Sequence, residues 1–176
     1  MKKYILVILL FAAVAYGCHQ TEAEPANETS GTTATPATPA VATVVVPAFN
    51  IMDIKGKPFN LADFKGKKIF VNLWASWCPP CRAEIPSIEK LYGKVDKNKV
   101  AFVMISLDDE FTTAVSFTTK NKLTVPVYFP AEKLPLLFNV DGIPATFIFD
   151  EKGNLIDRID GGDDYEAEKY VSLLSK

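Results

Sequence analysis

The hydrophobic pattern divides the chain into three stretches of different character. Residues 5–15 read ILVILLFAAVA and are wholly apolar, whereas residues 19–43 consist mainly of Thr, Ala, Pro and Glu, with no aromatic residue and no periodic apolar face. The second stretch cannot form a core and is expected to be disordered. From residue 44 onward, apolar runs alternate with turn signals, which predicts a folded domain over residues 44–176.

Two kinds of apolar run within this domain predict β-structure. Residues 67–75, KKIFVNLWA, and residues 100–108, VAFVMISLD, are nearly continuous, as expected of central strands covered on both faces. Two alternating runs meet at Gly153 and predict a hairpin, and the runs around Gly56 predict another hairpin at the start of the domain.

Helical spacing appears between these strands and at the end of the chain. Residues 78–95 and 110–123 carry apolar side chains three to four positions apart, and residues 131–140 suit a short helix. Residues 163–176 read as an amphipathic helix with acidic residues in its first turn, where the helix dipole favours them. Strands that alternate with helices, with a hairpin at each end, predict an α/β sandwich with a mixed central sheet.

Composition narrows the class of protein. The chain has 176 residues, 48% of them hydrophobic and 23% charged, which is enough for one sizeable core. Its formal net charge is -2, and the sequence lacks the basic face or stripe of a nucleic-acid binder. The composition therefore predicts one domain and disfavours a nucleic-acid partner.

The first 17 residues have the layout of a secretory signal, because Lys2 and Lys3 precede the apolar run and small residues follow it. The run is shorter than the roughly 20 residues of a membrane-spanning helix. Residues 15–17, AYG, suit an ordinary signal peptidase, but Cys18 directly after them resembles a bacterial lipobox. We favour the lipobox, since lipidation gives the odd cysteine a use, although Ala15 is smaller than the usual aliphatic residue there.

The expected mature protein is therefore held at a bacterial membrane on its extracytoplasmic, periplasm-facing side. Lipidated Cys18 would be the anchor, and residues 18–43 the disordered tether rich in Thr, Pro and Ala. A coil of about 25 residues would hold the domain roughly 25 to 30 Å from that anchor.

Cys78 and Cys81, in the segment WCPPC, could form a structural disulfide, a metal site or a redox-active pair. A position at a strand-to-helix junction places Cys78 at a helix N-terminus, which stabilises a thiolate. Structural zinc usually needs four ligands, and beyond this pair the chain offers only Cys18 and His19, far away on the tether. A purely structural disulfide that closes so short a loop would contribute little to folding stability. The residues thus favour a redox pair with no metal.

Residues 70–86, FVNLWASWCPPCRAEIP, and residues 142–150, GIPATFIFD, carry a resemblance to a known family. They are similar to thioredoxin-fold proteins, especially the extracytoplasmic, membrane-tethered thiol-disulfide oxidoreductases of the TlpA and ResA kind. The match covers about residues 47–174. It implies a thioredoxin-like three-layer sandwich with an N-terminal β-hairpin, and an enzyme that needs no bound cofactor.

The resemblance also implies a substrate site. Pro144 matches the cis-proline of the family, where Ile143 would offer backbone groups to a substrate peptide. That peptide would lie against Trp77, Pro79 and Pro80 beside the cysteines.

Two local features bear on the chemistry. Asn72 stands where cytoplasmic thioredoxins have a buried Asp, and Glu84, common in the tethered branch, is the expected replacement for proton handling. The alternative is that Glu84 is a solvated helix residue. Pro79 and Pro80 remove two backbone donors from the Cys78 sulfur, which makes the thiolate less stable and the dithiol a better reductant.

These features predict a protein-disulfide reductase in which Cys78 attacks a partner's disulfide and Cys81 resolves the mixed disulfide. The resemblance implies apocytochrome c cysteines or other exported proteins as substrates, and a transmembrane electron donor. The serious alternative is a disulfide-introducing oxidase or isomerase. A peroxidase is disfavoured because the peroxiredoxin signature is absent, and a copper metallochaperone because the sole histidine, His19, lies outside the domain.

Overall fold

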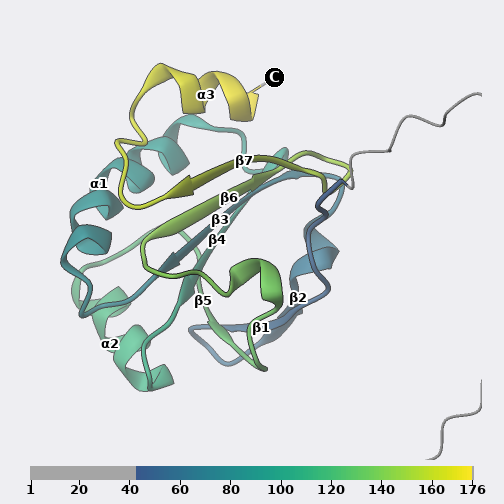
Figure 1. Ribbon diagram of the computed structural model, residues 1–176. Coiled ribbons are helices and arrows are strands. Elements are labelled where there is room, and N and C mark those ends of the chain that lie inside the picture. The colour runs from purple at the N-terminus through teal and green to yellow at the C-terminus, as the bar shows by residue number, and fades with distance from the viewer. Residues whose placement is uncertain (1–42, 176) are drawn as a thin grey trace, which may run out of the picture. The chain divides into compact units, whose positions relative to one another are not determined.

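The computed structural model describes residues 43–175, which contain three α-helices, two short 3₁₀ helices and seven β-strands. The elements alternate along the chain much as the sequence predicts (Figure 1). Their order is β1 (Asn50–Asp53), β2 (Pro58–Asn60), η1 (Leu61–Phe64), β3 (Lys68–Trp74), α1 (Pro79–Lys94), β4 (Val100–Ser106), α2 (Phe111–Lys120), β5 (Val127–Pro130), η2 (Leu136–Phe138), β6 (Ala145–Phe149), β7 (Leu155–Asp160) and α3 (Glu168–Ser175).

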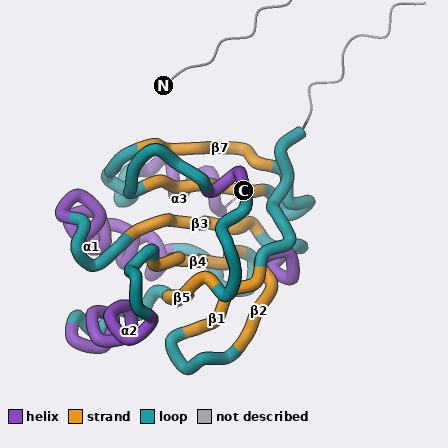
Figure 2. The backbone as a smooth tube through the Cα atoms, turned by 60° about the horizontal axis from the view of Figure 1, so that its bottom comes forward, coloured by secondary structure: helices purple, strands orange, loops and turns teal. Residues whose placement is uncertain are grey.

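All seven strands form one mixed sheet in the order β2-β1-β5-β4-β3-β6-β7. Strands β3, β4 and β5 run parallel, and the other neighbouring pairs are antiparallel. Every position of β3 and of β4 is buried, as the two continuous apolar runs predict, and the tube in Figure 2 shows both strands in the middle of the sheet. The mixed sheet and both hairpins are confirmed.

The two faces of the sheet are covered in different ways. Helices α1, α2 and α3 pack on one face, where Ile88, Tyr170 and Phe117 meet side chains of β3 and β4. The opposite face is covered by the single turns η1 and η2, through Leu61 and Phe138, and by the chain before β1. The thioredoxin-like sandwich is thus present, with its third layer built from 3₁₀ turns and loops.

Two of the helices expected from the sequence differ in the structure. Residues 131–140 form only the single turn η2, which follows Pro135 and leaves Leu136 91% exposed. Helix α3 begins at Glu168 rather than near residue 163. Asp163 instead accepts hydrogen bonds from Tyr170 and Lys169, and these contacts hold the preceding residues in a turn against α3.

Within the described part of the chain, no helix is both long enough and apolar enough to cross a membrane.

Candidate active site

The two cysteines lie where the central strand gives way to helix α1. Strand β3 ends at Trp74, and a turn closed by a 3.1 Å hydrogen bond from the Cys78 N–H to the Ala75 carbonyl leads into the helix. Cys78 is the N-cap of α1, and its sulfur is bonded to that of Cys81 at 2.03 Å. The sequence pattern at this junction therefore brings both sulfurs to the positive end of one helix.

The surroundings of the disulfide limit its contact with solvent. Cys78 is 2% exposed and Cys81 is completely buried, whereas Trp77 beside them is 62% exposed. Pro79 and Pro80 occupy the first helical positions and have no N–H, so the backbone donor that reaches the Cys78 sulfur is the Cys81 N–H, at 3.3 Å. Trp77 and the two prolines form the exposed surface next to the disulfide.

The loop before β6 closes the other side of the disulfide. The Ile143–Pro144 peptide bond is cis, which confirms the prediction from the resemblance. The Ile143 carbonyl oxygen lies 3.7 Å from the Cys78 sulfur, and the Pro144 carbonyl accepts a 2.9 Å hydrogen bond from the Gly161 N–H. The loop at Ile143 and Pro144 thus lies against the sulfur of Cys78, although the two are far apart in the sequence.

Glu84 is buried, so the reading of it as a solvated helix residue is wrong. It is 4% exposed, and its Oε1 accepts a 2.8 Å hydrogen bond from Nδ2 of Asn72, the residue that stands in place of the usual Asp. Burial raises the pKa of Glu84 to about 7, and the Asn72 donor opposes this rise only in part. The carboxyl group therefore exchanges its proton near neutral pH.

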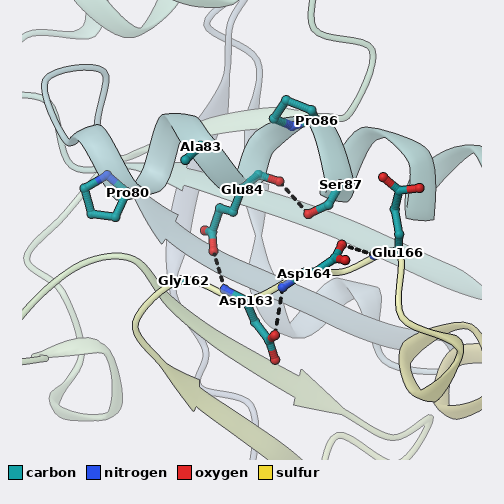
Figure 3. Close-up of a pocket in the computed structure, with 9 residues that line it drawn as sticks. All are labelled: Pro80, Ala83, Glu84, Pro86, Ser87, Gly162, Asp163, Asp164 and Glu166. Atoms are coloured by element: carbon teal, nitrogen blue, oxygen red, sulfur yellow. Dashed lines mark hydrogen bonds between the residues drawn. The ribbon is translucent and has the colours of Figure 1, made fainter.

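A cavity of about 630 Å³ opens beside this carboxyl group (Figure 3). Glu84 reaches across from α1 toward the segment after β7, where the Asp163 N–H donates to its Oε2 at 3.4 Å. The cavity gives the buried carboxyl group a route to solvent along one side of the cysteine helix. Its lining residues are Pro80, Ala83, Glu84, Pro86, Ser87, Gly162, Asp163, Asp164 and Glu166.

Thr146 and Tyr165 extend the hydrogen bonds of Glu84, and sequence reasoning missed both. Nδ2 of Asn72 also donates to Oγ1 of Thr146 at 2.9 Å, and the Tyr165 hydroxyl donates to the same oxygen at 2.6 Å. Asn72 and Thr146 are paired residues of β3 and β6. A polar residue inside each of two apolar strands was the available signal, because buried polar groups need partners.

Asp108, just after β4, was also missed. It is 4% exposed, and its carboxylate accepts hydrogen bonds from the Ser76 N–H at 3.1 Å, the Ser76 hydroxyl at 2.7 Å and the Ser106 hydroxyl at 2.7 Å. Ser76 lies in the turn that ends at Cys78. This buried carboxylate therefore holds the turn to the end of the neighbouring strand.

A bonded cysteine pair at a helix N-terminus, facing a cis-proline loop on a thioredoxin-like sheet, defines a thiol-disulfide oxidoreductase. The chain belongs to the Redoxin family, whose sequence profile matches residues 41–174.

Relatives and solved structures agree with this class. The chain is 30% identical over 131 residues to the thiol-disulfide oxidoreductase ResA of Bacillus thuringiensis subsp. konkukian, covering 73% of this chain and 76% of the relative. It is similar to the crystal structure of StoA from Bacillus subtilis, with a TM-score of 0.62, 29% identity and coverage of 73% and 99%. A secreted Mycobacterium tuberculosis disulfide oxidoreductase, described as homologous to E. coli DsbE, gives a TM-score of 0.60, 25% identity and coverage of 72% and 96%.

Proposed function

We propose that this oxidoreductase works as a reductase that opens disulfide bonds in exported proteins. The observation that carries the direction of the reaction is the pair Pro79 and Pro80, which have no N–H and leave the Cys81 N–H to donate to the Cys78 sulfur. A thiolate with fewer donors is less stable, and a dithiol that is less stable gives up its electrons more readily.

The reaction takes place in two exchange steps. The Cys78 thiolate attacks one sulfur of the partner's disulfide, which forms a mixed disulfide and releases the partner's other sulfur as a thiolate. Cys81 then loses its proton and attacks the Cys78 sulfur, which releases the partner as a dithiol and leaves the Cys78–Cys81 disulfide. A transmembrane donor of two electrons would return the pair to the dithiol.

The surrounding residues supply what these steps need. Glu84 takes the Cys81 proton, because its raised pKa lets the carboxylate accept and release a proton near pH 7. Pro144 and Ile143 present the backbone against which a substrate strand lies, and Trp77, with Pro79 and Pro80, forms the contact surface around the sulfurs. These roles are supported by the 3.7 Å approach of the Ile143 carbonyl and by the 62% exposure of Trp77.

The proposed setting is extracytoplasmic. It is supported by the signal-like residues 1–17 and by the secreted Mycobacterium tuberculosis protein among the similar structures. Cys18, the proposed lipid anchor, and the proposed tether at residues 18–43, except for its last residue, lie outside the described residues. Apocytochrome c cysteines are the proposed substrates, with other exported disulfide proteins as the wider class.

The reduction potential of the Cys78–Cys81 pair tests the direction of the reaction. Equilibration of the protein with thiol buffers should give a value at or below about -270 mV, the range of a dithiol that donates electrons. A value near about -120 mV would instead identify a disulfide-introducing oxidase. The double variant Cys78→Ser, Cys81→Ser, which carries no pair, provides the baseline.

We expect alkylation of the reduced protein by limiting iodoacetamide to modify Cys78 at least about tenfold faster than Cys81. Cys78 is the N-cap residue beside exposed Trp77, whereas Cys81 lies inside the first turn and is fully buried. Peptide mass spectrometry after a timed quench measures the two rates. Faster labelling of Cys81 would reverse the roles of attacking and resolving thiol.

Replacing Asp108 by asparagine should slow disulfide exchange several-fold and lower the free energy of unfolding by about 1 to 3 kcal/mol. The asparagine amide has one acceptor oxygen and cannot accept all the hydrogen bonds that the Asp108 carboxylate accepts. The turn at Ser76 would therefore be held less firmly to the end of β4. Ser106→Ala is the matched control, because it removes the two hydrogen bonds between Ser106 and Asp108 and leaves those from Ser76 in the turn. Equal loss of exchange rate in both variants would mean that Asp108 is purely structural.

The substitution Cys18→Ala should release the protein into the soluble extracytoplasmic fraction without altering its thiol chemistry in solution. The reason is that Cys18 is the residue available for lipid attachment directly after the signal-like segment. Cell fractionation and mass analysis of the mature N-terminus measure the outcome. An unmodified N-terminus on a protein that is already soluble would contradict the anchor.

A further inference from the structure

Lysines gather at the end of the sheet where β3 and β4 begin. The Lys67 ammonium group donates a 3.1 Å hydrogen bond to the Lys97 carbonyl, and the Lys68 N–H donates to the Lys99 carbonyl at 2.9 Å. The segments before the two central strands therefore lie side by side. Lys94, in the last turn of α1, leads into the same loop.

The turn between β6 and β7 adds to this group. The Gly66 N–H donates a 2.9 Å hydrogen bond to the Glu151 carbonyl, and the Lys65 side chain packs against Gly153. Lys152 therefore also lies at this end. We call the six lysines Lys65, Lys67, Lys94, Lys97, Lys99 and Lys152 the lysine patch; five are exposed and Lys67 is half-buried. Four carboxylates, of Asp63, Asp96, Asp150 and Glu151, share this end with buried Lys68, so the seven lysines and four carboxylates give it a net charge of +3.

The opposite end of the sheet carries the cysteines and the opposite charge. Strands β3 and β4 run from the lysine patch toward Cys78 for seven residues each, or about 20 Å. The loops around the cysteines and the end of β7 expose six carboxylates, two arginines and Lys133, and one of the arginines, Arg158, is paired with Asp160. The domain is therefore positive at one end and negative at the end that reacts. The exposed carboxylates are those of Asp109, Glu110, Glu132, Asp141, Asp160 and Asp164.

The chain enters the domain at the positive end. The Val46 N–H donates a 2.7 Å hydrogen bond to the Gly153 carbonyl, and the Leu155 N–H donates to the Val44 carbonyl at 2.8 Å. These contacts fix the first described residues beside Lys152. The 42 residues that precede them thus join the domain next to the lysine patch and away from the disulfide.

We propose that the lysine patch rests on the anionic phospholipid surface of the membrane to which the chain is tethered, and so holds the cysteines on the side away from that surface. Lysines near a membrane are attracted to anionic headgroups. The carboxylates at the other end are repelled by the same surface, so both ends favour one orientation. A tether that enters the domain beside the lysine patch keeps the patch close to the membrane surface. A weak attraction is then enough to orient the domain.

The inference rests on the proposed membrane attachment but not on the direction of the redox reaction. Its consequence is a protein that presents Cys78 and Trp77 to partners instead of to its own membrane. Diffuse attraction to headgroups suits these lysines, since they come from the end of α1 and from three separate loops, and five of the six are exposed.

The protein carries its own probe of orientation, because its two tryptophans, Trp74 and Trp77, lie at the cysteine end. Energy transfer from tryptophan to dansyl-labelled lipid headgroups reports how close that end comes to the bilayer. We would reconstitute the full chain, purified from membranes, in vesicles of phosphatidylcholine alone or of phosphatidylcholine and phosphatidylglycerol in equal parts. In the anionic vesicles we expect transfer to fall by on the order of twofold.

Salt and charge variants separate the patch from general charge effects. About 1 M salt, where the screening length is about 3 Å, should restore the transfer seen with phosphatidylcholine alone. The variant Lys97→Gln, Lys99→Gln, Lys152→Gln should show that higher transfer without added salt. The control Lys55→Gln, Lys120→Gln, Lys133→Gln removes the same charge from helix α2 and from two loops outside the patch, and it should behave as the unaltered protein does.

Equal transfer in both kinds of vesicle, higher transfer in the anionic vesicles, or equal effects of the two triple variants would each overturn the proposal. If the purified protein proves soluble, the proposed attachment fails first, and flotation of the soluble chain with the same vesicles still tests the patch. Binding to anionic vesicles that the Lys97, Lys99 and Lys152 variant loses would then support it, and absence of binding would refute it.

Discussion

The Cys81→Ser protein should accumulate in cells as a mixed disulfide with its substrates, and its turnover should fall by on the order of a thousandfold or more. Cys78 remains at the helix N-terminus and can still attack a partner, but the serine hydroxyl cannot displace the partner from the Cys78 sulfur. The fully buried position of Cys81 behind Cys78 keeps other thiols from replacing it easily.

Non-reducing electrophoresis and mass spectrometry of the trapped species would measure this effect and name the partners. Cys78→Ser is the matched control, because it keeps one buried thiol but lacks the attacking sulfur, and it should trap nothing. Trapping through Cys81 in that control would contradict the assigned order of attack. Exported disulfide proteins in the trapped set would support the proposed substrate class.

Replacing Glu84 by glutamine should slow resolution of the mixed disulfide by about 100-fold above pH 7, where the native carboxylate is charged and can accept the Cys81 proton. In the native protein the rate should rise through about pH 7, the pKa of Glu84, and the glutamine variant should lack this step. Stopped-flow exchange with a small disulfide, recorded across pH, measures both. Superimposable pH profiles would show that Glu84 takes no proton.

Glu84→Gln should also change the folding stability of the protein, which would not be expected if Glu84 were an exposed residue on the helix surface. The pKa of Glu84 is about 7 in the folded protein and lower in the unfolded chain, so between about pH 4.5 and 7 the folded state binds more protons. Folding stability contributed by this group therefore falls as pH rises through that window, by up to about 3 kcal/mol. Glu84→Gln should remove the fall in denaturant titrations at pH 5 and 8, whereas Glu151→Gln, at an exposed site, should retain it.

Sequence periodicity was most informative where burial is continuous along a strand. The runs that became β3 and β4 are buried at every position, and their apolar content had no competing explanation. The pattern of residues 131–140 was misleading because their apolar side chains cover the sheet from a loop, with Leu136 exposed and Phe138 buried within the same short turn. A pattern of hydrophobicity cannot by itself separate a helix from a loop that packs over a sheet.

The residues of the candidate site also differ in how well the sequence alone predicts them. The cysteines and the cis-proline were predictable because local spacing and the resemblance specify them. Asp108 was not, since its partner Ser76 is 32 residues away and only the parallel pairing of β3 with β4 brings the two together. The burial of Glu84 was readable in principle, because it shares the buried stripe of α1 with Cys81 and Ile88 at helical spacing.

The position of the disulfide next to a fully buried central strand also bears on how long the protein survives in the cell. Backbone amides in β3, which is flanked by β4 and β6, should exchange with solvent hydrogen only when the whole domain opens. The Cys78–Cys81 bond closes a loop of only two intervening residues, so loop closure itself adds little stability. A fold that disfavours the dithiol must nevertheless, by linkage, open more often when the pair is reduced than when it is oxidised. Proteases that act on opened chains should therefore degrade the reduced form faster, so the lifetime of the protein should depend on the fraction of its time spent as the dithiol.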